Sequence, residues 1–208
     1  LGIEWLVTPE KTIEDFIAAS GAAKYIAKPG LTAGAIGTFT FQSFDEFKEK
    51  ISLAIEKIPD YLNPNQYIIQ EFFDGELVSI EGYACQNKVD FIGATTRFKY
   101  GNTEVQHKFP YQNDMGNTAY NKCKNVVSTL IDRADFNYGF FHIEFMVNGD
   151  EVRLIDANMG RPGGTNVMEL IAFAYDVSPV NIFEHAISVA VLQKPVIENS
   201  FFDSPVRE

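Results

Sequence analysis

Four polar residues are concentrated in FFHIEFMVNGDEVRLIDANMGRPGG, residues 140–164, a stretch whose apolar residues otherwise alternate as in β-strands. They are Glu144, Asp156, Asn158 and Arg161. Carboxylate and amide oxygens are hard ligands that suit Mg²⁺ or Mn²⁺, with phosphate oxygens of a ligand completing the coordination. Zinc is disfavoured because no thiolate or histidine cluster accompanies these residues. The alternative interpretation is an exposed strand face that carries hydrated acids.

The metal hypothesis requires the side chains of Glu144 and Asp156 to share one face of a hairpin. Because successive strand residues point to opposite faces, the length of the turn decides this. A two-residue turn at Asn148 and Gly149 would place the two carboxylates on opposite faces, whereas a three-residue turn that includes Asp150 would place them together. We predict the three-residue turn.

Arg161 begins the segment RPGG, which ends at Gly164. The absence of a Cβ at Gly163 and Gly164 permits a ligand to approach the backbone closely. An arginine beside such a turn can bind a carboxylate or a phosphate through two parallel hydrogen bonds. A turn with a surface arginine explains the segment equally well.

Lys28 ends an apolar strand just before the glycine-rich segment PGLTAGAIGT. A lysine in this place can contact a phosphate as a point charge, and the backbone N–H groups of Gly30, Gly34 and Gly37 could cover phosphate oxygens. The spacing matches neither the Walker A motif nor GxGxxG. A hairpin loop of small residues is an equally good interpretation.

The segment IIQEFFDGE, residues 68–76, leaves an apolar strand through Gln70 and Glu71. A polar pair at the edge of an apolar crevice could hydrogen-bond the amino group of a nucleobase, and backbone groups from Phe72 to Asp74 could complete the recognition. The alternative is an edge strand that enters a turn at Asp74 and Gly75.

The elements that position these residues follow from hydrophobic periodicity and capping patterns. Thr8 and Pro9 resemble the first residues of a helix that ends at Ser20, and Ser43 with Glu46 forms a capping box for a second helix. The predicted fold class is α+β, with two lobes and a hinge near residues 70–75. Further helices are predicted near 123–131 and 178–192. Strands are predicted at 24–29, 39–41, 67–73 and 140–147, and a return strand that runs to residue 158 follows the last of these. A hairpin is predicted at 76–98 and a loop at 99–116.

Composition restricts the class of protein. The chain has 208 residues, 46% of them hydrophobic and 22% charged, which is typical of a globular protein with one large domain or two lobes. The net charge of −11 disfavours non-specific nucleic-acid binding. Cys85 and Cys123 form neither a metal-binding spacing nor a disulfide framework, and neither a signal peptide nor an apolar run of membrane length is evident. We expect a cytoplasmic protein with no nucleic-acid or membrane partner.

The order of these polar residues along the chain resembles that of the ATP-grasp superfamily. The resemblance extends from about residue 10 to residue 192, and residues 140–164 are most similar to the amino-acid ligase or carboxylate–amine ligase branch. It implies an ATP-grasp fold in which two α+β lobes hold the nucleotide between them. Residues 1–72 would form the lid subdomain with Lys28 and the glycine-rich flap, and residues 73–208 would form the C-terminal subdomain with the metal site.

The resemblance also assigns roles to individual residues. It implies that Lys28 holds the ATP phosphates, that the flap with Gly34 covers them, and that Glu71 reads adenine with backbone contacts from Phe73. Gln70 joins this adenine set from its place beside Glu71. The resemblance further implies that the metal ligands are Glu144, Asp156 and Asn158, and that Arg161 is catalytic and binds the acceptor carboxylate. The chain departs from the family pattern in three places: Asp156 replaces the usual glutamate, Arg161 is one residue farther from Asn158, and Leu77 occupies the position of a ribose-binding acid, for which Glu76 could substitute.

The implied activity is that of an ATP-dependent carbon–nitrogen ligase, which forms an amide through an acyl phosphate and releases ADP and phosphate. ATP and Mg²⁺ or Mn²⁺ would be the cofactors, and a small carboxylate and an amine the substrates. The alternatives are a biotin-dependent carboxylase, a nucleotide-biosynthesis ligase, and a nucleotide-binding module without catalysis. Arg97, His107 and Lys108 could line the acceptor site, although surface positions are the favoured interpretation, and His142 is interpreted as a packed structural residue.

Two expectations concern the whole protein. The sequence begins without Met, and the family's N-terminal domain would precede Leu1, so we expect the chain to be a fragment of the enzyme. Because members of the superfamily often form dimers, a homodimer is also expected.

Overall fold

The computed structural model describes residues 10–30, 35–59, 61–62, 67–100 and 103–207. The chain divides into two compact units, Leu1–Phe73 and Asp74–Glu208. This division falls one residue after the boundary expected from the sequence. Gly34 of the expected flap, and Thr8 with Pro9, lie outside the described residues.

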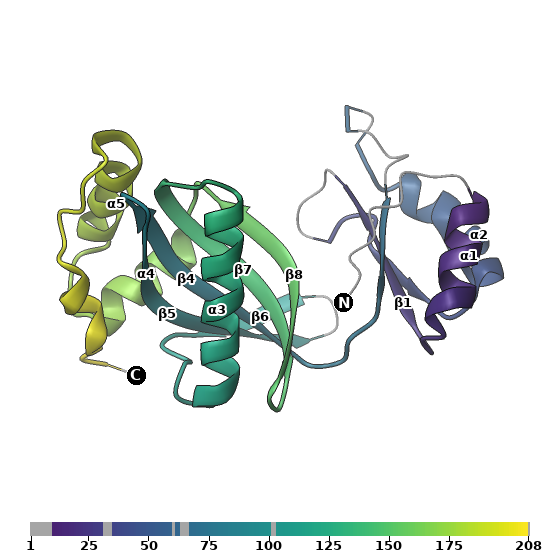
Figure 1. The fold of residues 1–208 in the computed structure, drawn as a ribbon, viewed down its shortest axis with the longest axis horizontal. Coiled ribbons are helices and arrows are strands. Elements are labelled where there is room, and N and C mark those ends of the chain that lie inside the picture. Colours follow the sequence, from purple (N-terminus) through teal and green to yellow (C-terminus); the bar gives the residue numbers. More distant parts are fainter. Residues whose placement is uncertain (1–9, 31–34, 60, 63–66, 101–102, 208) are drawn as a thin grey trace. The chain divides into compact units, whose positions relative to one another are not determined.

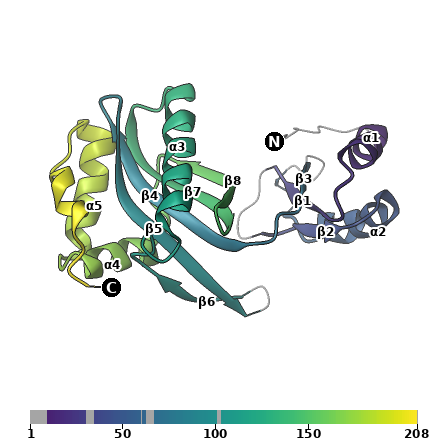
Figure 2. The ribbon, with the colours of Figure 1, turned by 60° about the horizontal axis from the view of Figure 1, so that its bottom comes forward.

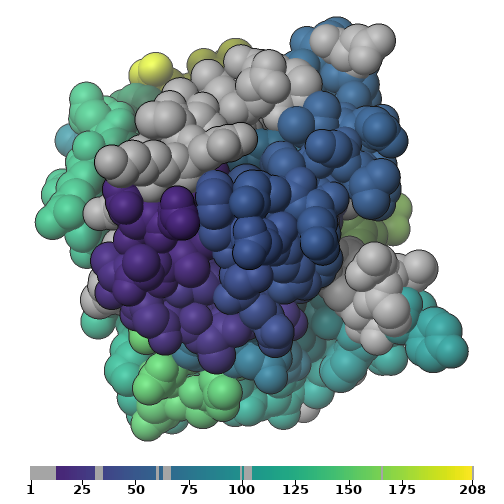
Figure 3. Space-filling view, turned by 90° about the vertical axis from the view of Figure 1, so that its right-hand side faces the viewer, coloured from purple at the N-terminus to yellow at the C-terminus, as the bar shows by residue number. Residues whose placement is uncertain are grey.

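The first unit contains an antiparallel sheet with two helices against it (Figure 1). The helices lie side by side at the surface (Figure 3). Ser43 Oγ accepts a hydrogen bond from the N–H of Glu46 and caps the second helix, which confirms the predicted helix start. The strand order is β2-β1-β3, and the elements are α1 (Glu10–Ser20), β1 (Tyr25–Pro29), β2 (Phe39–Phe41), α2 (Phe44–Ile55) and β3 (Tyr67–Glu71).

Alternation along β1 separates the two faces of this sheet. Tyr25 and Ala27 are fully buried in a core shared with both helices, whereas Ile26 and Lys28 are half-buried on the opposite face. Lys28 therefore lies on the face that α1 and α2 do not cover.

The second unit contains an antiparallel sheet with helices on both faces (Figure 2). One helix, α3 (Asn117–Arg133), packs on one face, and α4 (Thr165–Ala174) and α5 (Pro179–Ile187) pack on the other. The strand order is β6-β5-β4-β7-β8, with β4 (Glu76–Cys85), β5 (Lys88–Tyr100), β6 (Thr103–Lys108), β7 (Tyr138–Asn148) and β8 (Glu151–Met159). A π-helical turn (Ser188–Leu192) and a 3₁₀ helix (Asn199–Asp203) follow α5.

Two predictions in this unit were wrong or incomplete. The segment 99–116, expected to be a loop, contains the end of β5 and the edge strand β6. The sequence TEVQHK is mostly polar, and it is a strand because β5 supplies its backbone partners rather than because of its own propensity. The helix α4 was not among the predicted elements, and the last predicted helix ends at Ile187 before its π-helical turn.

Within the described part of the chain, no helix combines the length and the apolar character that crossing a bilayer requires.

Candidate functional site

The sheet face that carries α4 and α5 is apolar at one end and polar at the other. Tyr83, Cys85 and Phe140 pack against the helices at the apolar end. Because alternate residues along a strand share a face, this side of β4 and β7 continues with polar side chains, and the neighbouring strands β5 and β8 add others. We call this set the polar face: Ser79, Glu81, Arg97, His142, Glu144, Asp156 and Asn158.

Glu144 and Asp156 share one face of the β7–β8 hairpin, although its turn differs from the prediction. Asn148 pairs with Glu151, so the turn has two residues, and the predicted three-residue turn is wrong. The register then shifts by one residue next to Glu144, where β8 has an extra residue in a β-bulge. Beyond the bulge, Glu144 lies directly opposite Asp156, and residues opposite each other in an antiparallel pair project from the same face.

The carboxylate of Glu144 is held through one of its two oxygens. Arg97 Nη2 lies 2.6 Å from Oε1 and His142 Nε2 lies 3.1 Å from the same atom. Neither of these two contacts involves the other carboxylate oxygen of Glu144, Oε2. Burial raises the pKa of Glu144, but the hydrogen bond with His142 and the charge of Arg97 outweigh it and lower the pKa to about 2. Glu144 is thus a carboxylate at every physiological pH, with one oxygen left for a further partner.

His142 lies behind Glu144 and is almost fully buried. Its Nδ1 is 2.8 Å from Glu81 Oε1, which also accepts a hydrogen bond from Ser79 Oγ. Burial lowers the pKa of His142, but the carboxylates of Glu81 and Glu144 outweigh it and raise the pKa to about 9.

Nε2 of His142 has two neighbours that require different protonation states. It lies 2.6 Å from Arg97 Nη2, and an arginine can only donate, so this contact needs a lone pair on Nε2. The contact with Glu144 instead needs an N–H on Nε2. A neutral ring with its proton on Nδ1 would donate to Glu81 and accept from Arg97, whereas a protonated ring would donate to Glu81 and Glu144.

Asp156, Asn158 and Arg161 form a chain of hydrogen bonds. Asn158 Nδ2 donates to Asp156 Oδ2 at 3.0 Å, and Arg161 Nη2 donates to Asn158 Oδ1 at 2.5 Å. The extra residue between Asn158 and Arg161 therefore does not separate the arginine from the predicted metal ligands. Asp156 and Arg161 are exposed and Asn158 is half-buried, so these contacts can be exchanged for contacts with a ligand.

Gly163 is required by packing within the protein. A Cβ on Gly163 would lie 2.3 Å from Nδ1 of His142, far inside van der Waals contact. The RPGG segment consequently rests on the ring of His142. The sequence interpretation, in which this glycine admits a ligand, missed that contact.

In the first unit, Lys28 and Gln70 lie on the sheet face away from the helices. Lys28 pairs with Ile68 and Ile26 pairs with Gln70, so these four residues share a face. Lys28 and Gln70 are thus diagonal neighbours with Ile26 and Ile68 beside them, and the patch combines an apolar surface with a cation and an amide. Glu71 ends β3 and is exposed, and Phe73 ends the unit.

Glu76 does not belong to the polar face. Its two carboxylate oxygens accept hydrogen bonds from Thr96 Oγ1 at 2.8 Å and from the Tyr111 hydroxyl at 2.6 Å. By strand alternation, Glu76 projects with Val78 toward α3, on the opposite side from Glu144. The idea that Glu76 substitutes for the ribose-binding acid is therefore corrected, because a shift of one residue reverses the face.

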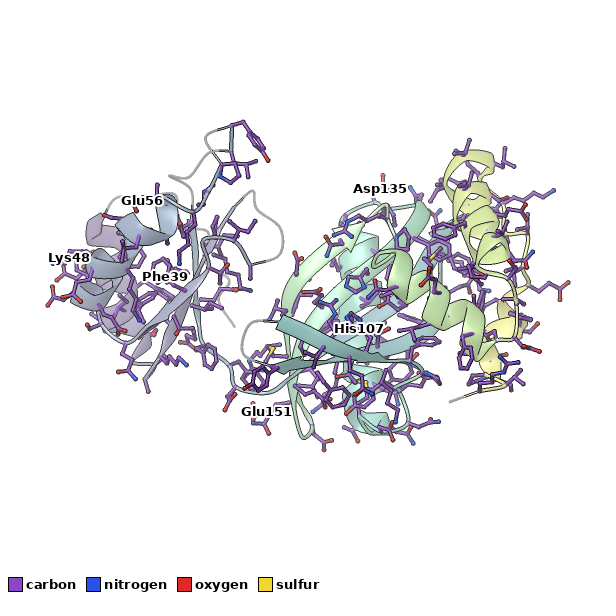
Figure 4. The ribbon with its side chains drawn as sticks, turned by 180° about the vertical axis from the view of Figure 1, so that it is seen from behind. Phe39, Lys48, Glu56, His107, Asp135 and Glu151 are labelled. Atoms are coloured by element: carbon purple, nitrogen blue, oxygen red, sulfur yellow. The ribbon has the colours of Figure 1, made fainter. Side chains whose placement is uncertain are left out.

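The three suggested acceptor-site residues have different environments. Arg97 has a side chain only 11% exposed and belongs to the polar face, which contradicts the surface position favoured from the sequence. His107 on β6 (Figure 4) pairs with Arg97 on β5, and its ring contacts Asn166 at the start of α4. Lys108 pairs with Asp114 at 2.6 Å and is partly exposed.

Sequence reasoning did not single out Glu81. The available signal was an acidic residue inside the apolar run of β4, ELVSIEGYAC.

The donor set of the polar face fits Mg²⁺. In the described ranges, no group of three His, Cys, Asp or Glu side chains could hold a metal ion, so a site here depends on the amide of Asn158 beside two carboxylates. Hard oxygen donors with few protein ligands are typical of Mg²⁺ sites that nucleotide phosphates complete. The hydrogen bonds that the described residues make to Glu144 use Oε1 and leave Oε2 for a cation, and the contacts of Asp156 and Asn158 are exchangeable, which is compatible with this coordination.

Comparisons with known proteins identify the fold. The sequence model of the ATP-grasp domain matches residues 22–169. The biotin carboxylase domain of Hydrogenobacter thermophilus 2-oxoglutarate carboxylase, in complex with MgADP and bicarbonate, superposes with a TM-score of 0.74 and 10% identity over 95% of this chain and 42% of that chain.

Two other enzymes show the same fold. For phosphoribosylglycinamide synthetase from Anaerococcus prevotii the TM-score is 0.60, with 19% identity over 91% of this chain and 46% of that chain. For D-alanyl-alanine synthetase A from Vibrio cholerae O1 biovar eltor it is 0.64, with 10% identity over 92% of this chain and 58% of that chain. The chain thus spans about half the length of these structures. Comparison with curated proteins gives no match.

Proposed function

Because the chain belongs to the ATP-grasp domain family, we propose that it binds ATP with Mg²⁺ and is the nucleotide-binding part of an ATP-dependent ligase that joins a carboxylate to an amine. The observation that carries this proposal is the position of Glu144 directly opposite Asp156, with Asn158 and Arg161 hydrogen-bonded beside them. The MgADP in the 2-oxoglutarate carboxylase domain, which has the same fold, supports the choice of nucleotide and metal.

Each residue of the proposed site has a role that follows from its chemistry. Glu144, Asp156 and Asn158 would hold Mg²⁺, which would offset the charge of the nucleotide phosphates. Lys28 would contact phosphate oxygens, and the segment with Gly34 would cover them. Gln70, Glu71 and Phe73 would contact adenine, with Ile26 and Ile68 as the apolar surface beside Gln70. Glu76 is left out of the set because it faces α3.

The proposed reaction has two steps. A carboxylate oxygen of the acid attacks the γ-phosphorus of ATP, the bond to the bridging oxygen breaks, and ADP leaves. The amine nitrogen then attacks the carbonyl carbon of the acyl phosphate, and loss of phosphate and a proton gives the amide. The protein contributes mainly position and charge: Arg161 has an exposed guanidinium that can bind a carboxylate through two hydrogen bonds.

Calorimetric titration of this chain with ATP tests the nucleotide site. We expect ATP to bind more tightly with Mg²⁺ than without it, and Glu144→Ala to lose at least about tenfold of the Mg²⁺-dependent affinity. ATP binding that is indifferent to both Mg²⁺ and Glu144 would refute the assignment of the metal ligands.

Measurement of ADP release with a panel of acids tests the reaction. Release that requires an amino acid and an amine, together with the amide identified by mass spectrometry, would support the carboxylate–amine ligase. Release stimulated by bicarbonate instead would assign a carboxylase reaction. Tight ATP binding without release on any substrate would indicate a nucleotide-binding module without catalysis.

A further inference from the structure

A buried carboxylate–imidazole pair lies behind the proposed metal site and has no role in the reaction described above. Glu81 on β4 and His142 on β7 are directly opposite each other, and both side chains are 3% exposed. Their carboxylate and imidazole are 2.8 Å apart. Neither residue is exposed enough to contact a substrate, so any function must act through a neighbour.

The ring of His142 contacts several parts of the site at once. Nδ1 faces Glu81, Nε2 faces Arg97 and Glu144, and the Cα of Gly163 rests on the ring. One buried side chain thereby touches both a predicted metal ligand and the RPGG segment that carries the predicted catalytic arginine.

The pair Glu81–His142 also restricts the motion of Glu144. Ser79 donates a hydrogen bond to Glu81, so the chain of contacts from Ser79 through Glu81 and His142 to Glu144 crosses from β4 to β7. A histidine bonded through one ring nitrogen cannot turn freely, and the other nitrogen then has a fixed direction. Glu144 has three side-chain torsions, and fixing Oε1 in advance lowers the entropy lost when Oε2 binds a cation.

We propose that Glu81 and His142 are positioning residues, which orient the carboxylate of Glu144 for the metal–nucleotide complex and support the RPGG segment beside it. The inference rests on the proposed function, because it gives this buried pair a role in the same site. A role in stability alone is a poor explanation, since a buried ion pair usually contributes little more than apolar residues of the same volume.

The test compares two substitutions of Glu81 by titrating the chain with ADP, with and without Mg²⁺. Glu81→Leu removes the acceptor for Nδ1 of His142, and we expect it to raise the Kd of ADP about tenfold or more with Mg²⁺ while leaving the Kd without Mg²⁺ unchanged. Glu81→Gln keeps an acceptor oxygen and should restore most of the Mg²⁺-dependent affinity. A general loosening of the sheet would instead weaken binding equally under both conditions.

Asp90→Asn provides the matched control. Asp90 is a buried carboxylate on β5 with an ion pair to Lys88, at the end of the sheet near Tyr83 rather than near the polar face. The substitution Asp90→Asn should leave the Mg²⁺-dependent affinity for ADP unchanged. Circular dichroism would verify that each variant is folded.

Gly163→Ala keeps the inference testable if Glu81→Leu does not fold. The added Cβ would press on the ring of His142 without changing any charge, and we expect the same selective loss of Mg²⁺-dependent ADP binding. Selective loss in either folded variant supports the proposal. The positioning role alone would be overturned if the wild type shows Mg²⁺-dependent binding and both Glu81→Leu and Gly163→Ala leave it unchanged. The same conclusion would follow if both variants weaken binding equally with and without Mg²⁺. Absence of Mg²⁺-dependent binding in the wild type would overturn the proposed function, and the positioning role with it.

Discussion

Glu144 lies directly opposite Asp156 across β7 and β8, although the two-residue turn of this hairpin would by itself put their side chains on opposite faces. Pairing from Asn148 and Glu151 leads to Phe145 opposite Leu154, and one more regular step would place Ile155 opposite Glu144. The bulge takes up this residue and brings the next one into the pair. A local irregularity of the sheet thus brings the two carboxylates together.

This pairing predicts that both carboxylates are needed for metal-dependent binding. Glu144→Gln and Asp156→Asn retain size and hydrogen bonding but remove the negative charge that a divalent cation requires. We expect each substitution to weaken ATP binding by about tenfold or more in the presence of Mg²⁺, and to leave binding without Mg²⁺ unchanged. Calorimetry under both conditions measures the difference.

Glu151→Gln is the matched control on the same hairpin. Glu151 is exposed beside the turn and lies 3.6 Å from Arg153 in a surface ion pair, so its charge contributes little (Figure 4). Equal losses in all three variants would show a general effect of negative charge on the hairpin rather than a metal site.

Lys28 is predicted to recognise the phosphates rather than the base. Lys28→Met keeps the length of the side chain but removes its charge. ATP and ADP should bind less tightly to this variant, by about tenfold, whereas adenosine should bind as it does to the wild type. Lys48→Met is the control, because Lys48 lies on α2 in an ion pair with Asp45. If Lys28→Met weakened the binding of adenosine as much as that of ATP and ADP, Lys28 would have a structural role instead.

His185 predicts how stability changes with pH. It is fully buried, and its Nδ1 accepts hydrogen bonds from the N–H groups of Val196 and Ile197. Burial lowers the pKa of His185 to about 4, although Asp90 opposes the shift. At pH values between about 6.5, the pKa of histidine in the unfolded chain, and about 4, the pKa of His185 in the folded chain, the unfolded chain binds a proton that the folded chain does not. The free energy of unfolding should therefore fall by about 3 kcal/mol as the pH drops from 6.5 to 4.

Urea unfolding at several pH values between 7 and 4.5 measures this dependence. Glutamine offers an acceptor oxygen but does not titrate, so His185→Gln should flatten the dependence in this window. An unchanged slope in that variant would attribute the acid sensitivity to other groups.

The two cysteines are predicted to be unreactive in the folded protein. Cys123 is fully buried, and burial raises the pKa of its thiol to about 12, while burial followed by the charge of Asp90 raises the pKa of Cys85. A thiol-specific chromogenic disulfide should modify neither residue at pH 8 without denaturant and both in urea. Rapid modification of the folded chain would contradict the described burial.

Hydrophobic periodicity was sufficient for most of the fold, because it reports which residues must leave water. It located α1, α2, α3 and the β4–β5 hairpin. It did not reveal β6, whose polar residues adopt a strand because β5 offers hydrogen-bond partners, and it missed α4.

The same limit applies to the candidate site. Residue types and their order singled out Glu144, Asp156, Asn158 and Arg161, and the three-residue turn inferred from them was wrong. Glu76 was misplaced, since the face on which a strand residue projects depends on register, which is set by partner strands far away in the sequence.

The sequence by itself determined the α+β class, the membership in the ATP-grasp family and the identities of the polar residues, since these depend on local pattern and residue chemistry. Only the tertiary structure showed that the bulge pairs Glu144 with Asp156, that Arg97 is a largely buried partner of Glu144, and that His142 contacts both Glu81 and Gly163. These contacts join residues between 12 and 61 positions apart, which only the pairing and packing of the strands bring together.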